Sequence, residues 1–252
     1  ADAIGFSGSV AFSENNNAGS LAIGVAIGSN KINNSVSAFI IDSTVNSGAG
    51  VNLSSANSAI ITAHSTAVAV ALSAGDKKAL SLSGGGAEST NVILPLINAY
   101  TDASTITSHG DVTIAATDSS DIDATVLAAA ITASLGKSAG GASIGASFAT
   151  NLIGWEAISA DASGQIQAYA KNVKIVAEGD LYLTALEKST IDATVHAIAV
   201  GIVGAIGGNA GQLSGAGVRT ENKIRIKVKA FIDGDPKLGA ADKGTITADS
   251  AS

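Results

Sequence analysis

Apolar and polar side chains alternate along several segments of this chain, most clearly from residue 223 to residue 229. The apolar positions there are Ile224, Ile226 and Val228, and the intervening positions are Lys223, Arg225, Lys227 and Lys229. A period of two places alternate side chains on opposite faces of a β-strand. The pattern therefore predicts a strand with one apolar face and one basic face.

Alanine-rich segments follow the same period of two. Ala67, Ala69 and Ala71 alternate with Val68 and Val70, so both sets of positions are apolar. Helix propensity alone would favour an α-helix here, but dense Val, Ile and Thr together with recurring Gly favour a strand. We expect such strands to be buried on both faces, or to pack one face against another sheet or subunit.

These segments recur in four units. Asn-Lys-Ile at 30–32 precedes Val-Ser-Ala-Phe-Ile at 36–40, and the same spacing separates 222–224 from 228–232; the third unit's counterpart is aligned to 157–160. One asparagine opens this segment in each unit: Asn30, Asn91, Asn151 and Asn222. The predicted units are residues 1–57, 58–118, 119–187 and 188–252 of a single segment.

The asparagine column has two structural interpretations. Asparagine side chains can form an amide ladder between neighbouring strands, or they can occupy turns that need a left-handed backbone. We favour the turn, because about three coils per unit would keep equivalent residues off adjacent coils.

An aspartate follows each asparagine by ten to twelve residues. This second column consists of Asp42, Asp102, Asp161 and Asp233. Aspartates at a corner suit either Ca²⁺ binding or a turn in which the side chain bonds the backbone. The glycine-rich nonapeptide typical of Ca²⁺-binding repeats is absent, so we favour the turn and expect no cofactor.

Composition narrows the function classes. The chain has 252 residues, 29 Gly, two Pro, no Cys and a net charge of −7. The lack of Cys excludes disulfides and thiolate metal sites, and the negative charge argues against nucleic-acid binding. The apolar stretch 195–208 is shorter than the roughly 20 residues of a spanning helix, so no membrane span is expected.

Enzyme chemistry is not expected either. Gly141-Ala142-Ser143-Ile144-Gly145 matches the G-x-S-x-G string of hydrolases. Small residues occupy the equivalent positions of the other units, however, and the three histidines fall at different phases of the repeat. We interpret the string as part of a repeated strand.

Stacking explains how such units fold. A unit of about 60 residues with so few aromatic residues would have a poor core if it stood alone. The predicted fold is therefore an all-β, parallel β-solenoid (β-helix) of four tandem repeats, each about 57–70 residues long, in which neighbours bury each other. An array of antiparallel β-sandwiches is the second choice.

The repeat pattern also resembles that of a known protein class. Gly-Asp-Val-x-Ile-x-Ala at 110–116, Ile-Asp-Ala-x-Val at 122–126 and 191–195, and the asparagine-led segments resemble repeats of very large bacterial exoproteins. These are leukotoxin-type and filamentous-haemagglutinin-like adhesins. The resemblance implies a right-handed solenoid, export from the cell, and a role in adhesion or a fibrous surface layer.

The predicted function is structural: a rod or fibre segment at the bacterial surface or outside the cell. Because the chain begins and ends at one phase of the repeat, we expect it to stack on itself or on adjoining repeats. The alternative is an adhesin module that binds a carbohydrate or receptor, with an ice-binding protein third. We interpret the basic stripe Lys223, Arg225, Lys227 and Lys229 as a solvated face whose like charges discourage sheet aggregation. The alternative is contact with an acidic surface polysaccharide or with a neighbouring rod.

Overall fold

The computed structural model describes residues 1–156, 159–234 and 246–248, and the regular elements in these ranges are all β-strands. They are β1 (Asp2–Ser13), β2 (Ala18–Ile41), β3 (Thr44–Ser47), β4 (Val51–Asn57), β5 (Ile60–Asp102), β6 (Thr105–Ser108), β7 (Val112–Asp118), β8 (Asp121–Ile153), β9 (Trp155–Glu156), β10 (Ser159–Lys171), β11 (Lys174–Ala177), β12 (Leu181–Glu187), β13 (Thr190–Ala205), β14 (Ala210–Ile224), β15 (Ile226–Asp233) and β16 (Ile246–Ala248). Strands of successive units pair in parallel in curled sheets, which confirms the prediction of an all-β fold with parallel strands.

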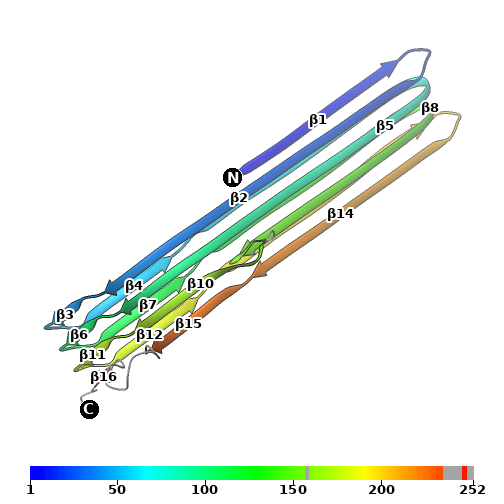
Figure 1. Ribbon diagram of the computed structural model, residues 1–252. Coiled ribbons are helices and arrows are strands. Elements are labelled where there is room, and N and C mark those ends of the chain that lie inside the picture. The colour runs from blue at the N-terminus through cyan, green and yellow to red at the C-terminus, as the bar shows by residue number, and fades with distance from the viewer. Residues whose placement is uncertain (157–158, 235–245, 249–252) are drawn as a thin grey trace.

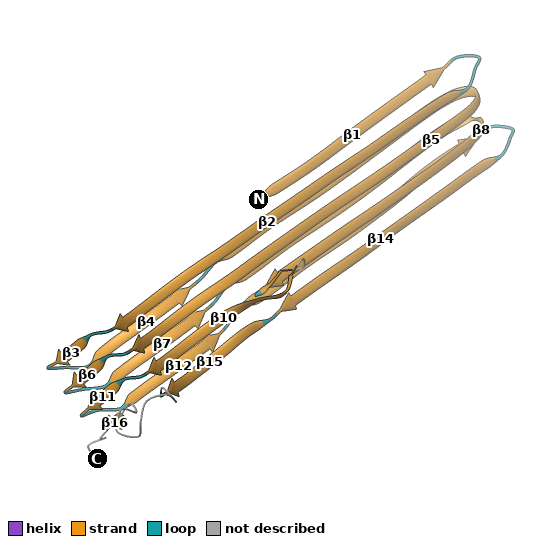
Figure 2. Ribbon diagram, in the orientation of Figure 1, coloured by secondary structure: helices purple, strands orange, loops and turns teal. Residues whose placement is uncertain are grey.

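Each unit makes one long circuit of the molecule (Figure 1). An outgoing leg runs to one end, the chain reverses, and a return leg runs back. β5 contains both legs: residues 64–75 pair with β1, and residues 79–102 pair with β2. We call the end with these reversals the tip, and the end with the short strands β3, β6 and β11 the base. Figure 2 shows that strands fill nearly the whole length between the turns.

Residues one unit apart pair directly. Asn30 lies opposite Asn91, which lies opposite Asn151, which in turn lies opposite Asn222. The expectation of three coils per unit is therefore wrong, because one unit forms one coil. The expectation assumed strands of ordinary length, about 5–6 residues, whereas β2 alone has 24. The long axis of the molecule consequently runs along the strands.

Three sheets surround a conventional core at the base. The return legs form one wall, β3, β6, β11 and β16 form the second, and β4, β7 and β12 form the third. Their inner faces bring together large aliphatic side chains, including Ile97, Ile106, Ile114, Ile166 and Ile175, each at most 1% exposed.

Only two layers remain at the tip, and small side chains lie between them. The inward positions of the return leg of β5 include Ala79, Ser81 and Ala87, all buried. A Cβ on Gly85 would lie 2.5 Å from the carbonyl oxygen of Ala129, and one on Gly24 would lie 2.6 Å from that of Val68. The two layers are thus much closer than the roughly 10 Å of ordinary stacked sheets.

An insertion interrupts the third unit. The Gly154 N–H donates to the Ile93 carbonyl (2.7 Å), and the Gly164 N–H donates to the Gly154 carbonyl (2.8 Å). Between these glycines, β9 pairs antiparallel with the first residues of β10, and β10 rejoins the main sheet with Gln165 opposite Leu96. The alignment of 157–160 with the repeated strand is therefore wrong: 166–169 occupy that place. Residues 157–158 themselves lie outside the described residues.

Candidate functional site

The asparagine column forms a continuous amide ladder. Each Nδ2 donates to the Oδ1 of the next asparagine: Asn30 to Asn91 (2.8 Å), Asn91 to Asn151 (2.8 Å) and Asn151 to Asn222 (2.9 Å). Asn91 and Asn151 are fully buried. The turn role favoured from the sequence is wrong for this column, because one coil per unit puts equivalent residues on adjacent strands.

The ladder has a direction. Since every amide donates toward the later unit, Asn30 presents a free Oδ1 at the first edge and Asn222 presents a free Nδ2 at the last, counting partners within the described residues. One edge thus ends in an acceptor and the opposite edge in a donor.

An aromatic stack runs parallel to this ladder on the outer face of the base, nine positions further along β2 and β5. Phe39, Tyr100, Tyr169 and Phe231 stack in register, with ring centroids 5.6, 4.7 and 5.0 Å apart. Burial first, and then Tyr100 and Asp102, raise the pKa of Tyr169 above its ordinary value. The sequence alignment missed Tyr169 because of the insertion, although Ile-x-Ala-Tyr at 166–169 repeats Ile-x-Ala-Tyr at 97–100.

The proposed aspartate column does not assemble. Lys171 lies opposite both Asp102 and Asp233, and Asp161 lies upstream in β10, outside this column. Asp42 lies one position beyond Ile41, the partner of Asp102. Lys171 thus separates Asp102 from Asp233, so the column does not provide adjacent carboxylates that could bind Ca²⁺. The described residues contain no cluster of three or more side chains that could hold a metal ion.

A left-handed corner follows that column instead. Asp42, Ala103 and Asn172 come directly after the paired residues and have φ of 47°, 46° and 51°. Asn and Asp tolerate this conformation better than other residues with a Cβ. We expected a turn role of both columns, and among their described members Asp42 has this left-handed conformation.

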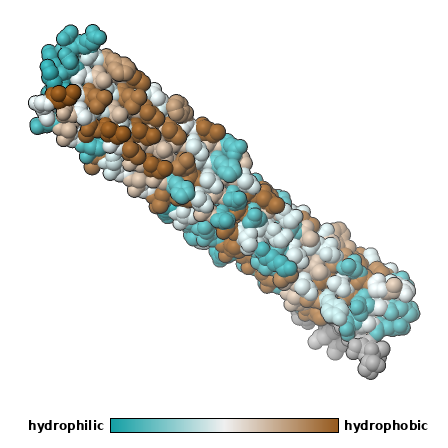
Figure 3. All heavy atoms as spheres, turned by 180° about the vertical axis from the view of Figure 1, so that it is seen from behind, coloured by the Kyte–Doolittle hydropathy of each residue, from teal (hydrophilic) through white to brown (hydrophobic). Residues whose placement is uncertain are grey.

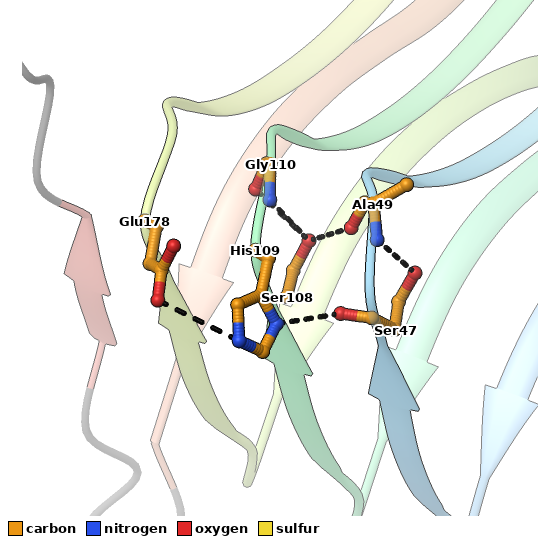
Figure 4. A network of polar contacts seen from close by, with 6 residues as sticks. All are labelled: Ser47, Ala49, Ser108, His109, Gly110 and Glu178. Carbon is orange, nitrogen blue, oxygen red and sulfur yellow. Dashed lines mark hydrogen bonds and ion pairs between the residues drawn. The ribbon is translucent and has the colours of Figure 1, made fainter.

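The base turns are cross-linked by a polar network (Figure 4). Ser108 Oγ donates to the Ala49 carbonyl (2.8 Å), while His109 Nδ1 lies 3.1 Å from the Ser47 carbonyl and its Nε2 3.7 Å from Glu178 Oε1. Serine, histidine and glutamate meet here, but the imidazole contacts a backbone oxygen and not the Ser47 hydroxyl. The network fastens one turn to the next and lacks the nucleophile–base contact of a hydrolase.

The G-x-S-x-G serine lies inside a strand. Ser143 is fully buried, and its Oγ lies 2.9 Å from that of Ser214 in the next unit. Its in-register partner on the other side is Ser83. A nucleophile elbow needs an exposed serine at a sharp turn into a helix, and this serine has neither feature.

The basic stripe lies on the outer face of the last return leg. Within it, Lys223 and Arg225 stand 4.2 and 5.9 Å from the ring centre of Trp155, which belongs to the insertion. Lys223 also pairs with Glu221, and this contact chiefly lowers the pKa of that carboxyl. Lys227 and Lys229 are exposed, so only they present free charge.

Two carboxyl groups lie together where the outgoing legs leave the base. Asp118 is fully buried and accepts hydrogen bonds from Asn57 Nδ2 (2.8 Å) and Ser120 Oγ (2.8 Å). Glu187 lies opposite it in the next unit. Burial raises the pKa of Glu187, and the Asp118 charge adds to this, while hydrogen bonds from Ser189 partly oppose it.

No helix in the described part of the chain is both long and apolar enough to span a membrane. Comparisons with known proteins find no family model, no curated protein and no solved structure that matches this chain.

Proposed function

We propose that the chain is a β-solenoid segment of a secreted bacterial surface protein, and that its function is structural. It forms a rod or fibre by adding one parallel coil to another, and it is not an enzyme. The one-coil-per-unit register supports this proposal, because each unit is paired along its length by its neighbours. The adhesin-like repeat pattern supports the extracellular location.

The polarity of the asparagine ladder carries the proposal. A second copy placed beyond the last unit would bring its Asn30 Oδ1 to the donor left free on Asn222. The aromatic stack ends in Phe39 at one edge and Phe231 at the other, so it would continue across the same junction. Exposed edge strands template further pairing unless something blocks them.

A proline on the first edge tests this stacking. In a parallel pair, successive backbone N–H groups point to alternate sides of the strand. The Asp42 N–H donates to Asp102 in the second unit, so the Ser37 N–H, an odd number of positions away, points to the open edge. Proline at position 37 therefore removes a backbone N–H that makes no hydrogen bond to the described residues. The position is exposed, so the proline ring can be accommodated there.

The parent chain is expected to form filaments in negative-stain electron microscopy and to sediment as long assemblies. Ser37→Pro should shorten them drastically, while Ser37→Ala should behave like the parent. A parent chain that stays monomeric at high concentration contradicts the proposal. Retention of that monomer on a glycan array would favour the carbohydrate-binding alternative.

A further inference from the structure

Both outer faces of the tip are apolar. On the face formed by the outgoing legs, which we call the outgoing face, Phe6, Phe12 and Ile202 are 75%, 78% and 62% exposed. On the return face, Ile23 and Leu213 are 62% and 70% exposed. Figure 3 views the molecule from behind and shows apolar residues gathered over the half that lies away from the C-terminal end. Monomers seldom leave such large patches uncovered.

Glycines on the return face distinguish it from an ordinary apolar surface. Gly84, Gly86, Gly215 and Gly217 point outward, and a Cβ built on any of them would meet no atom within 4 Å. Inward glycines such as Gly85 are explained by the opposite backbone at 2.5 Å. Glycine weakens a strand and commonly marks the close approach of another backbone. Nothing in the described part of the chain approaches the outward glycines, which leaves room there for the surface of another molecule.

Small residues interrupt the large ones in two rows of the return face, whereas the row Leu21, Leu82, Ala142, Leu213 is large on most strands. One row reads Ile23, Gly84, Ile144, Gly215, and the next reads Val25, Gly86, Ala146, Gly217. The rows of the outgoing face instead carry bulk on most strands, as in Val10, Leu72, Ala133, Ile202. The return face therefore has hollows, and the outgoing face has ridges.

We infer that the return face of one copy packs on the outgoing face of a second copy. The apolar band on each face is nine residues long and four strands wide. At the usual rise per residue and spacing between strands, it measures about 30 Å along the strands and about 19 Å across them, an area of about 570 Å² per copy. Two such surfaces bury about 1,100 Å² in total, near the lower limit for a specific interface. Because the two surfaces differ, each copy keeps one of them free, and the contact repeats without closing.

One arrangement thus covers both apolar faces. A two-fold pairing of return faces would leave the outgoing face bare, and lipid chains would give no reason for outward glycines. The contact uses the faces and not the strand edges, so it is independent of the edge stacking proposed above. Together, the two contacts would build a layered fibre.

Two double variants test the contact in a Ser37→Pro chain, where edge stacking is suppressed. Gly84→Val with Gly86→Val fills the hollows of the return face, and Leu72→Lys with Ile202→Lys puts charge on the ridges of the outgoing face. Each variant alone should lose concentration-dependent association in sedimentation velocity. An equimolar mixture should form heterodimers, because each variant retains the face that the other lacks. Gly48→Val, at an equally open glycine in a base turn, should associate like its parent.

Thermal unfolding of each variant checks that the fold is intact, which the open space around Gly84 and Gly86 leads us to expect. Unchanged association of the filled-hollow variant would overturn the inference. So would dimers of the Leu72→Lys, Ile202→Lys chain alone, because they would show two-fold pairing of return faces. A third contrary result would be that the parent and the Gly84→Val, Gly86→Val variant both bind phosphatidylcholine vesicles, and to the same extent, in a flotation assay. Lipid would then be what covers the return face. Loss of association by each double variant alone, together with heterodimers in the equimolar mixture, supports the contact.

Discussion

The base and the tip of this molecule are built from the same strands, yet they distribute apolar bulk in opposite ways. At the base, large residues such as Ile114 and Ile166 point inward, and polar residues such as Ser37 and Asn98 point outward. At the tip, alanine, serine and glycine point inward, and large residues such as Ile23 and Ile202 point outward. A single strand changes from one arrangement to the other along its length.

The difference shows that the size of the inward residues sets the distance between layers. Branched side chains at the base hold three sheets apart around a core. Small residues at the tip let two layers approach until backbone faces backbone, as at Gly85. The tip then has little interior in which to bury large side chains, so its apolar surface is left for a partner. The base stabilises the single chain, and the tip favours association.

The largest effect should come from adding bulk inside the tip. Gly85→Val would drive a methyl-bearing Cβ into the Ala129 carbonyl oxygen, 2.5 Å from an ideal Cβ, and should cost more than about 3 kcal/mol. Its neighbour Gly86→Val points outward and should change stability by less than about 0.5 kcal/mol. Urea unfolding of both variants measures the contrast; equal stabilities would refute the close approach of the layers.

Removing bulk from the base should come second. Ile166→Ala empties part of a fully buried core position and should cost about 3 kcal/mol. Ile144→Ala removes a side chain of the same size from the outer face of the tip, where it is 61% exposed, and should cost the isolated chain little. Chemical denaturation under conditions that keep the chain monomeric makes the comparison, and a similar loss at both sites would argue against it.

The asparagine ladder marks the border between the two regions on the return legs. Asn91→Ala removes its hydrogen bonds with Asn30, Asn151 and Ser89, and it leaves the buried Oδ1 of Asn151 without its donor, so it should cost about 2 kcal/mol. Asn30→Ala at the edge breaks one bond and should cost about half as much. If the central and edge variants melted at the same temperature, the ladder would contribute little to stability.

On the outgoing legs the border carries Glu187, and the expected effect there is the smallest. Its raised pKa means that the folded chain binds this proton more tightly than the unfolded chain does. This contribution to stability is complete below the unfolded pKa of about 4.3 and is lost as pH rises through the folded pKa. Glu187→Gln should therefore be more stable than the parent at neutral pH.

A series of melts from pH 7 to pH 4 checks this sign. The advantage of Glu187→Gln should shrink as pH falls, because the parent carboxyl becomes neutral as well. Glu14→Gln, at an exposed position of a tip turn, is the control and should show no such trend. A constant difference across the series would mean that burial does not perturb Glu187.

Much of the fold was predictable from local pattern. Alternation at 223–229 and even spacing of alanines predicted strands, and the fixed spacing after Asn30 and Asn222 predicted a repeat. The insertion was not predictable in the same way, because it adds nine residues between Ile153, which lies opposite Ile93, and Gln165, which lies opposite Leu96. It turned Asp161 into an apparent member of a column in which the structure places Lys171.

The candidate surfaces, too, were predictable from the sequence only in part. The sequence supplied the members of the asparagine column and the alternation of the basic stripe, because both depend only on spacing within a strand. It did not show that the column is a ladder, nor that Trp155 lies beside Lys223. Those contacts depend on which residue 60–71 positions away lies on the adjacent strand.

By itself, then, the sequence determined the strand character, the repeat and its members, because period-two patterns and recurring spacings are local properties of the backbone. Only the tertiary structure decided that each unit is a single coil, that asparagines pair across coils, and that the tip exposes its apolar side chains. The physical reason is that strand length and layer spacing are collective quantities. They follow from where the chain reverses and from how closely the inward residues of two legs let the legs approach.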